Sequence, residues 1–132
     1  MERWLGRYGD VAYALLRIVA GLMFALHGAQ KLFGFLGPQM TSQTMPLIAG
    51  IIEFVGGLLI AVGFEAGWAA FIAAGEMAVA YFMVHAPGSF WPTVNKGELA
   101  VLYCFVFLYV ATRGSGPYSI DAAVRGTGRA RR

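Results

Sequence analysis

Apolar residues fall into four long stretches along the chain, separated by short connections that are richer in glycine, proline and polar residues. The stretches cover residues 11–36, 45–64, 67–86 and 98–112. A helix needs about 20 apolar residues to cross a hydrocarbon core of about 30 Å, and only the fourth stretch is clearly short of this length. Backbone groups in lipid must pair within their own segment, and no stretch alternates with the period of two that a barrel strand requires. The pattern therefore predicts an all-α, integral membrane four-helix bundle.

The connections and the end of the chain suggest a simple domain organisation. Glycine and proline mark the turns, which are expected at residues 37–38, 64–67, 87–92 and 113–117. Arg17 interrupts the first apolar stretch, and no clean cleavage site follows it, so we expect a retained helix and not a signal peptide. We expect one membrane domain over residues 1–121, followed by a basic, disordered tail over residues 122–132.

Composition supports a lipid environment. Hydrophobic residues make up 58% of the 132 residues and charged residues only 13%, whereas a soluble domain usually has about 25% charged residues. A soluble domain of this size has too much surface for its volume to bury so many apolar side chains. Cys104 is the single cysteine, which excludes an intrachain disulfide.

The distribution of lysine and arginine predicts the orientation of the chain. The first and third connections hold only Lys31 and Lys96, whereas both ends of the chain are rich in arginine. The positive-inside rule therefore places both termini in the cytoplasm, which agrees with an even number of crossings. The arginines in question are Arg3, Arg7, Arg17, Arg113, Arg125, Arg129, Arg131 and Arg132.

Glu53 and Glu76 stand out because each lies inside an apolar stretch. A charged residue at the centre of a bilayer costs about 2.5–3.5 kcal/mol on insertion scales. Small residues recur at helical spacing on the faces of both glutamates, and small residues let helices approach closely. Both carboxyl groups should therefore point at neighbouring helices and not at lipid.

Further polar residues lie at the ends of the first and third stretches, on the side of the bundle predicted to face outward. We expect three of them, His27, Lys31 and His85, to line one pocket together with Glu53, with Glu76 deeper. Simpler interpretations stay open, because the glutamates could pin helix packing, Lys31 could extend to the membrane interface and His27 could be a hydrogen-bonded core residue. The two histidines lack metal-ligand spacing, and we expect no metal site.

The connection before the fourth stretch has a local pattern of its own. Asn95 is followed three residues later by Glu98, which resembles a capping box at the start of a helix. We therefore expect the fourth helix to begin with Asn95 as its capping residue.

Three segments together resemble the DoxX family. They are LRIVAGLMFALHGAQKLFG at residues 16–34, EFVGGLLIAVG at 53–63, and EMAVAYFMVHAPGSFWPTVNKGELAVLYCFVFLYVATRGSGPYSID at 76–121. The resemblance implies a multi-pass protein of the bacterial inner membrane with four helices. The family takes its name from the membrane subunit of a thiosulfate:quinone oxidoreductase, and some members are linked to complexes that handle thiols or remove superoxide. The positions that match the family pattern are His27, Gln30, Lys31, Glu53, Glu76, His85, Asn95 and Glu98.

The leading hypothesis is a membrane subunit of a quinone-linked oxidoreductase complex concerned with thiols, sulfur or oxidative stress. Whether the chain is itself an enzyme stays open, because it has no flavin, dinucleotide or iron–sulfur motif, and electrons would come from a partner subunit. Carboxylates and imidazoles could carry protons, and we expect Glu53, Glu76, His27 and His85 in that catalytic role. Hydrogen-bonding and aromatic side chains would hold a non-covalently bound quinone, namely His27, Gln30, Lys31, Tyr81 and Trp91, with Phe24, Phe33 and Phe82 nearby.

Two other classes of function remain open. The chain could be a non-catalytic scaffold or accessory subunit of a larger complex, or, less in keeping with its short length and lack of an inverted repeat, a small proton or solute transporter. The expected partners are the lipid bilayer, other membrane subunits and a second copy of the chain, and we expect no nucleic acid.

Overall fold

The computed structural model describes residues 1–37 and 43–129, with side chains described up to Arg125. Within these residues every regular element is helical. Pro38, which was expected in the first turn, lies outside the described residues. The elements are α1 (Glu2–Leu5), η1 (Gly6–Tyr8), α2 (Gly9–Phe33), α3 (Thr44–Val62), α4 (Ala66–Ala80), η2 (Tyr81–His85), α5 (Pro92–Asn95), α6 (Glu98–Arg113) and α7 (Ile120–Arg129).

The predicted all-helical membrane fold is confirmed. Three helical segments of the described chain are long and apolar enough to cross a membrane: Glu2–Phe33, Thr44–Val62 and Ala66–His85. The fourth predicted segment forms α6, which has 16 residues. Large apolar side chains cover the outside of the helices, and Phe71, Leu102 and Phe105 are each about 60% exposed, at 59%, 62% and 64%. Water would not tolerate so much exposed apolar surface, whereas lipid does.

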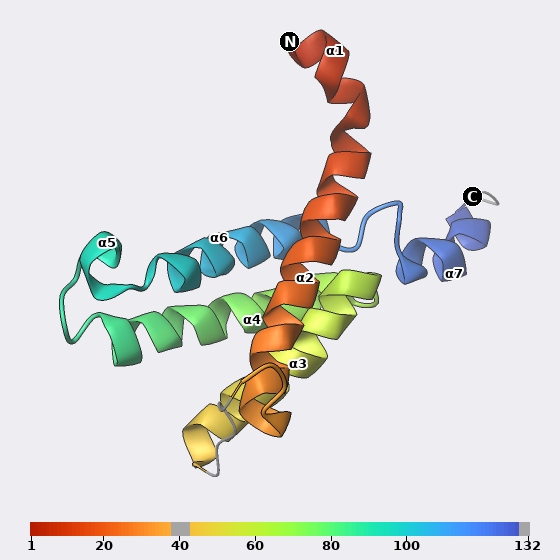
Figure 1. Ribbon diagram of the computed structural model, residues 1–132. Coiled ribbons are helices and arrows are strands. Elements are labelled where there is room, and N and C mark those ends of the chain that lie inside the picture. Colours follow the sequence, from red (N-terminus) through yellow and green to blue (C-terminus); the bar gives the residue numbers. More distant parts are fainter. Residues whose placement is uncertain (38–42, 130–132) are drawn as a thin grey trace.

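Helices α2 and α3 form a close antiparallel pair (Figure 1). The contact is made where glycines leave room for backbone to approach backbone. A Cβ added to Gly57 would lie 2.5 Å from the backbone nitrogen of Ala25, and one added to Gly21 would lie 2.6 Å from that of Ala61. Helices in lipid associate through such close packing, because apolar burial offers no advantage over lipid.

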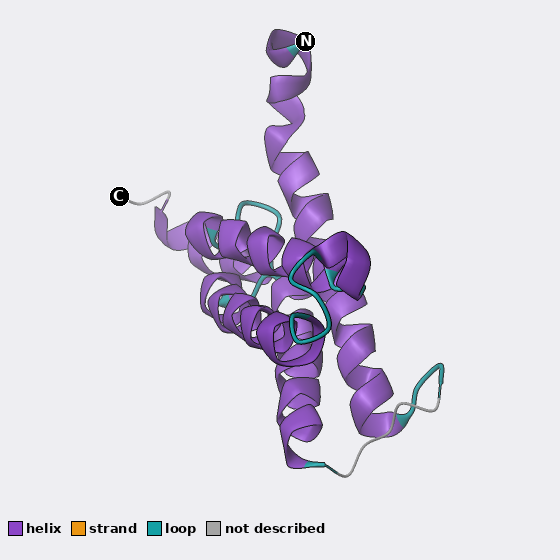
Figure 2. Ribbon diagram, turned by 90° about the vertical axis from the view of Figure 1, so that its left-hand side faces the viewer, coloured by secondary structure: helices purple, strands orange, loops and turns teal. Residues whose placement is uncertain are grey.

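Helices α4 and α6 lie side by side and run across the α2–α3 pair (Figures 1 and 2). Alanines of α4 are buried in this contact, and Ala70 and Ala73 are completely buried. The rings of Phe24, Tyr103 and Phe107 fill the space between α2 and α6, with Tyr103 and Phe107 stacked at 5.4 Å between ring centres. The core therefore lies where the two helix pairs cross.

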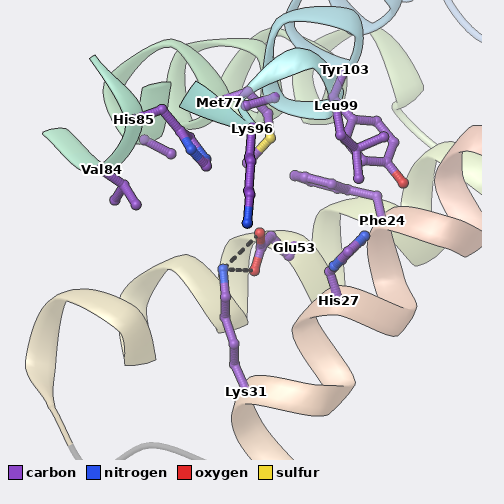
Figure 3. Close-up of a pocket in the computed structure, with 12 residues that line it drawn as sticks. Phe24, His27, Lys31, Glu53, Met77, Val84, His85, Lys96, Leu99 and Tyr103 are labelled. Atoms are coloured by element: carbon purple, nitrogen blue, oxygen red, sulfur yellow. Dashed lines mark hydrogen bonds and ion pairs between the residues drawn. The ribbon is translucent and has the colours of Figure 1, made fainter. Parts of the chain in front are cut away.

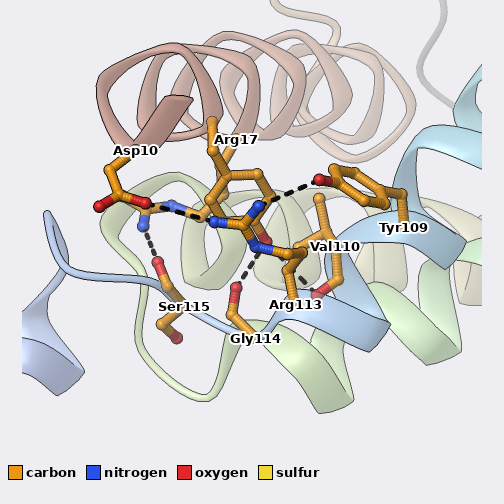
Figure 4. A network of polar contacts seen from close by, with 8 residues as sticks. Asp10, Arg17, Tyr109, Val110, Arg113, Gly114 and Ser115 are labelled. Carbon is orange, nitrogen blue, oxygen red and sulfur yellow. Dashed lines mark hydrogen bonds and ion pairs between the residues drawn. The ribbon is translucent and has the colours of Figure 1, made fainter. Parts of the chain in front are cut away.

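Arg17 is 1% exposed and ties the segment after α6 to α2 and α3. Its guanidinium donates to the backbone carbonyl oxygens of Ser115, of Tyr118 at 2.8 Å and of Ala61 at 3.4 Å. Tyr13, one turn earlier on α2, donates to the carbonyl oxygen of Gly114 at 2.5 Å. Figure 4 shows the guanidinium of Arg17 directed at Ser115. We call this set of contacts the arginine clasp.

The segment after residue 121, whose composition suggests disorder, forms most of α7, which spans residues 120–129. Ser119 supplies a reason, since its hydroxyl accepts a hydrogen bond from the backbone of Ala122 at 3.1 Å and so caps the first turn. Asp121 accepts hydrogen bonds from the backbone N–H of Glu65 at 2.8 Å and from the hydroxyl of Ser115 at 2.7 Å. Tertiary contacts with the start of α4 therefore order a segment whose composition suggested disorder.

The predicted capping box before α6 is also wrong. Asn95 ends the short helix α5, Lys96 adopts a left-handed conformation with φ of 63°, and Gly97 is the residue that precedes α6. The Asn95 side chain accepts a hydrogen bond from Gly97 N–H at 2.8 Å and donates to the Ser89 carbonyl at 2.7 Å. Asn95 therefore fixes the shape of the connection instead of capping α6.

Candidate functional site

A cavity of about 290 Å³ lies where the far end of α2 and the first half of α3 meet the end of α4, the turn η2 and the start of α6 (Figure 3). We call it the Glu53 cavity. Its polar lining residues come from five elements or connections, and its walls are otherwise apolar. The lining consists of Phe24, His27, Lys31, Glu53, Met77, Ala80, Val84, His85, Lys96, Leu99, Ala100 and Tyr103. The cavity thus brings together the four side chains that the sequence predicted to share a pocket.

Glu53 is the most deeply buried polar group of the cavity, with 3% of its side chain exposed. Lys31 Nζ lies 2.9 Å from Oε1 and 2.7 Å from Oε2 of Glu53, so one ammonium group bridges both carboxylate oxygens. The lysine side chain itself is 31% exposed. A buried carboxylate is tolerated only when it is paired, and this pair connects the end of α2 to α3. Lys31 therefore does not simply extend toward the membrane interface.

The two histidines lie on different walls of the cavity. His27 stands edge-on to the ring of Tyr103, with 6.0 Å between ring centres. His85 Nδ1 lies 3.1 Å from the carbonyl oxygen of Asn95, and because a carbonyl only accepts hydrogen bonds, Nδ1 carries the proton. In the neutral ring Nε2 is then the free acceptor. The cavity therefore holds an imidazole whose tautomer is fixed by the backbone.

Lys96 is a lining residue that the site prediction missed. Its ammonium group points at Glu53 from the side opposite to Lys31 in Figure 3. The left-handed backbone of Lys96 and the hydrogen bonds of Asn95 aim the side chain into the cavity. In the sequence, Lys96 lies in the connection between two apolar stretches. Helical periodicity does not apply there, so it cannot predict where the side chain points. Two lysines and one buried carboxylate leave the described cavity with an excess of positive charge.

Tyr103 was also missed. It lies in an apolar run of α6, where an aromatic residue gives no sequence signal of its own. The structure buries it to 6% exposure, between the two aromatic rings of Phe24 and Phe107, and its hydroxyl has no hydrogen-bond partner among the described residues. Among the described residues of the lining, it alone combines a buried ring with an unpaired polar atom.

Glu76 does not line the cavity, but its carboxyl group lies close enough to Glu53 and Lys31 to interact electrostatically with both. One of its oxygens is buried without a hydrogen-bond partner in the described part of the chain. Glu76 therefore borders the site from α4.

Other predicted site residues lie outside the cavity. Gln30 is half-buried on α2 and does not line it. Trp91 is 65% exposed, and Phe33 and Phe82 are 60% and 62% exposed. Tyr81 is buried, but its hydroxyl donates to the carbonyl of Phe90 and accepts from Asn95, so it supports the connection that carries Lys96. The aromatic walls are instead Phe24 and Tyr103.

The turn η2 lies between Glu76 and His85. Residues 81–85 form a π-helical turn, in which the N–H of Ala86 bonds to the carbonyl of Tyr81 at 2.8 Å. Such a turn contains an extra residue, so it shifts the helical phase of His85 relative to the residues of α4. No group of three or more histidine, cysteine, aspartate or glutamate residues with metal-binding geometry occurs in the described chain.

Helical packing through small residues, a lipid-compatible surface and a polar cavity inside the bundle define a multi-pass helical membrane protein. Residues 12–86 match the model of the DoxX family, and the chain belongs to this family. It is 42% identical over 125 residues to an uncharacterized protein of Haemophilus influenzae, covering 89% of this chain and 93% of that protein. It is 31% identical over 121 residues to the inner membrane protein YqjF of Escherichia coli, covering 85% and 91%. The protein is thus a multi-pass protein of the bacterial inner membrane, as predicted. No solved structure matches it.

Proposed function

We propose that this protein is the membrane subunit of a quinone-linked oxidoreductase complex and that the Glu53 cavity holds the quinone head. The observation that supports the proposal most directly is a buried carboxylate, paired with Lys31, inside a cavity that two imidazoles and a second lysine also line. A quinone supplies electron-accepting chemistry, since its reduction consumes two electrons and two protons.

The lining fits such a head in size and chemistry. A volume of about 290 Å³ is at the lower end of the range for small-molecule sites, about 300–1,000 Å³. Phe24 offers an aromatic surface, while Lys96 and His27 are polar groups on different walls that could bond to the two oxygens of a ring. Met77, Val84 and Leu99 add apolar surface against which a ring could pack. The proposed quinone-binding residues do not include Gln30, Tyr81 and Trp91, which lie outside the lining of the cavity.

The residues of the cavity would supply protons. Glu53 is held by Lys31 in a position where proton uptake would release the lysine, so the pair can exchange a proton without moving a helix. His85 presents one fixed tautomer, and Glu76 lies within electrostatic range behind Glu53. Intramembrane acids and imidazoles arranged in this way are typical of proton paths. Electrons would come from a partner subunit, because the chain carries no redox cofactor motif.

The experiment is to extract the protein gently from bacterial membranes, measure co-purified quinone and repeat the measurement on Glu53→Gln. Glutamine keeps the shape of the side chain but does not titrate or hold an ammonium group by charge. We expect quinone in the wild type and at least a fivefold lower content in Glu53→Gln. Glu2→Gln, at an exposed position in α1, is the matched control and should keep the wild-type content. A partner-bound preparation without any quinone would refute the proposal.

A structural role for the same ion pair is the second candidate, because Lys31 satisfies both oxygens of Glu53 and joins two helices. In that case the protein is a scaffold in a larger complex. Glu53→Gln would then weaken the helix contact and leave the activity of any assembled complex unchanged, whereas the redox proposal expects intact assembly with lost activity. We also propose that both termini lie in the cytoplasm. Labelling of a cysteine placed at each terminus would test this orientation.

A further inference from the structure

A second depression in the molecule lies next to the Glu53 cavity, and its lining is apolar except for Tyr103. It is a groove of about 390 Å³ between α2 and α6, and no charged residue lines it. Its lining consists of Leu15, Leu16, Val19, Ala20 and Met23 from α2, and Leu99, Leu102, Tyr103 and Val106 from α6. From residue 15 to residue 23 the groove follows α2 for about 12 Å, at a rise of about 1.5 Å per residue.

The groove and the cavity share a wall. Leu99 and Tyr103, one turn apart on α6, line both spaces. The apolar groove and the polar cavity therefore adjoin at these two side chains. This arrangement fits one molecule with a small polar head and a long apolar tail.

Tyr103 is an independent observation that points to a ligand at this wall. The residue is 6% exposed, and its hydroxyl is buried without a hydrogen-bond partner among the described residues. A buried hydroxyl left unpaired costs about 1–3 kcal/mol, so a partner is expected. Figure 3 shows the hydroxyl directed away from Glu53 and toward α2, the helix that forms the other side of the groove.

We propose that the groove holds the isoprenoid or alkyl tail of the quinone, that the head lies in the Glu53 cavity, and that Tyr103 donates a hydrogen bond to the ligand where head and tail meet. This inference rests on the proposed function, since it extends the same site. A phospholipid is a poorer occupant, because its phosphate head belongs at the membrane surface, whereas the groove adjoins a space inside the bundle. A second copy of the chain is a poorer occupant as well, since it would cover the groove without filling the adjoining Glu53 cavity.

The test is photolabelling of the full-length protein in nanodiscs with a benzoquinone whose decyl tail carries a diazirine, followed by peptide mapping. We expect saturable labelling of α2 residues 15–23 and α6 residues 99–106, and competition by excess unlabelled quinone. Saturable labelling confined to the outer face of α3 or α4 would overturn the inference. Competition by phospholipid but not by quinone would also overturn it, because the groove would then be a lipid site.

Two variants make the test specific. Val19→Trp fills the groove from an exposed position and should lower the labelling at least fivefold, whereas Phe71→Trp, at a similarly exposed position on α4, should leave it unchanged. Tyr103→Phe should bind the quinone about three- to tenfold more weakly while the thermal stability of the empty protein stays equal or rises, since the hydroxyl has no protein partner. A stability loss with unchanged binding in Tyr103→Phe would overturn the proposed hydrogen bond.

The outcomes separate this inference from the proposed function. Quinone that co-purifies and depends on Glu53, together with labelling outside the groove, refutes the tail site and leaves the redox proposal intact. No saturable quinone binding of any kind refutes the redox proposal and the tail site together. A dimer that dissociates in Val19→Trp with unchanged labelling shows that a second copy covers the groove, which again overturns the tail site.

Discussion

The arginine clasp and the Glu53 cavity both bury a charged side chain inside the bundle, yet they treat it differently. Arg17 is surrounded by backbone carbonyls from two parts of the chain, and no cavity adjoins it among those described. Glu53 is paired by one lysine, faced by another and bordered by about 290 Å³ of space. Backbone acceptors cannot titrate or leave, whereas a lysine can release its carboxylate. We therefore interpret the clasp as structural and the cavity as the part of the molecule available for binding and proton exchange.

The comparison predicts that Arg17→Ala has the largest effect on stability. The change leaves several buried carbonyl groups without their charged donor, and we expect a loss of about 3–5 kcal/mol in the free energy of unfolding. Thermal unfolding in mild detergent measures it. Arg113→Ala, at a side chain 40% exposed, is the control and should cost much less, because solvent screens its contacts. Equal losses for both variants would contradict the assignment of the clasp as the structural centre.

Lys31→Met should have the next largest effect. It leaves the buried carboxylate of Glu53 without its partner, and we expect a cost of about 1–3 kcal/mol, reduced because Lys96 points at the same group. The double variant Lys31→Met/Glu53→Gln should recover most of this loss, since no buried charge is left unpaired. Chemical unfolding of the four members of this cycle gives the coupling energy. A coupling close to zero would mean that the pair does not hold α2 to α3.

Helices α2 and α3 contribute residues to both the arginine clasp and the Glu53 cavity. Their contact can be tested with two adjacent glycines of α3, Gly56 and Gly57. Gly57→Ala places a Cβ 2.5 Å from the backbone of Ala25 and should cost about 1–3 kcal/mol by forcing the helices apart. Gly56→Ala meets nothing within 4 Å and should be neutral or stabilise the helix by up to about 1 kcal/mol. Thermal unfolding of the two adjacent variants compares them directly. Similar behaviour of both would argue against glycine-dependent packing at this position.

Lys96→Met should have the smallest effect on stability and a clear effect on binding. The lysine is exposed and makes no ion pair in the described structure, so we expect a change in unfolding free energy within about 0.5 kcal/mol. The quinone content of the purified protein should nevertheless fall, because one polar group of the cavity is lost. The folded fraction of Arg17→Lys should, in contrast, keep the wild-type quinone content. The two results together would separate the binding region from the structural one.

The sequence predicted the helices well because lipid imposes length and apolarity on each of them directly. It also predicted that His27, Lys31, Glu53 and His85 share a pocket, since polar residues in apolar helices must face the interior. The directions of Lys96 and Tyr103 could not be predicted in this way. Lys96 depends on a left-handed backbone in a connection, and Tyr103 depends on how α6 packs against α2.

Two placements that the sequence did not indicate have a common physical origin. The order of α7 depends on hydrogen bonds that the backbone N–H groups of Glu65 and Ala66, at the start of α4, donate to Asp121 and Ser115, about 50 residues later in the chain. Local composition contains no trace of these contacts. The placement of Trp91 depends on the connection around α5, which Asn95 folds through contacts with Ser89 and Tyr81. Specific hydrogen bonds between separate segments decided both cases, whereas the sequence patterns consider only apolar spacing and composition.

The arginine clasp has a consequence for the biosynthesis of the protein. Ser115 and Tyr118 follow Arg17 in the chain by 98 and 101 residues, so the guanidinium leaves the ribosome long before these acceptors exist. The first helix must enter the membrane with an unsatisfied cation, which water or lipid phosphate has to solvate during translation. Folding of the bundle can be completed only when the last segment arrives, and release of the nascent chain before residue 115 would leave the first helix without these contacts.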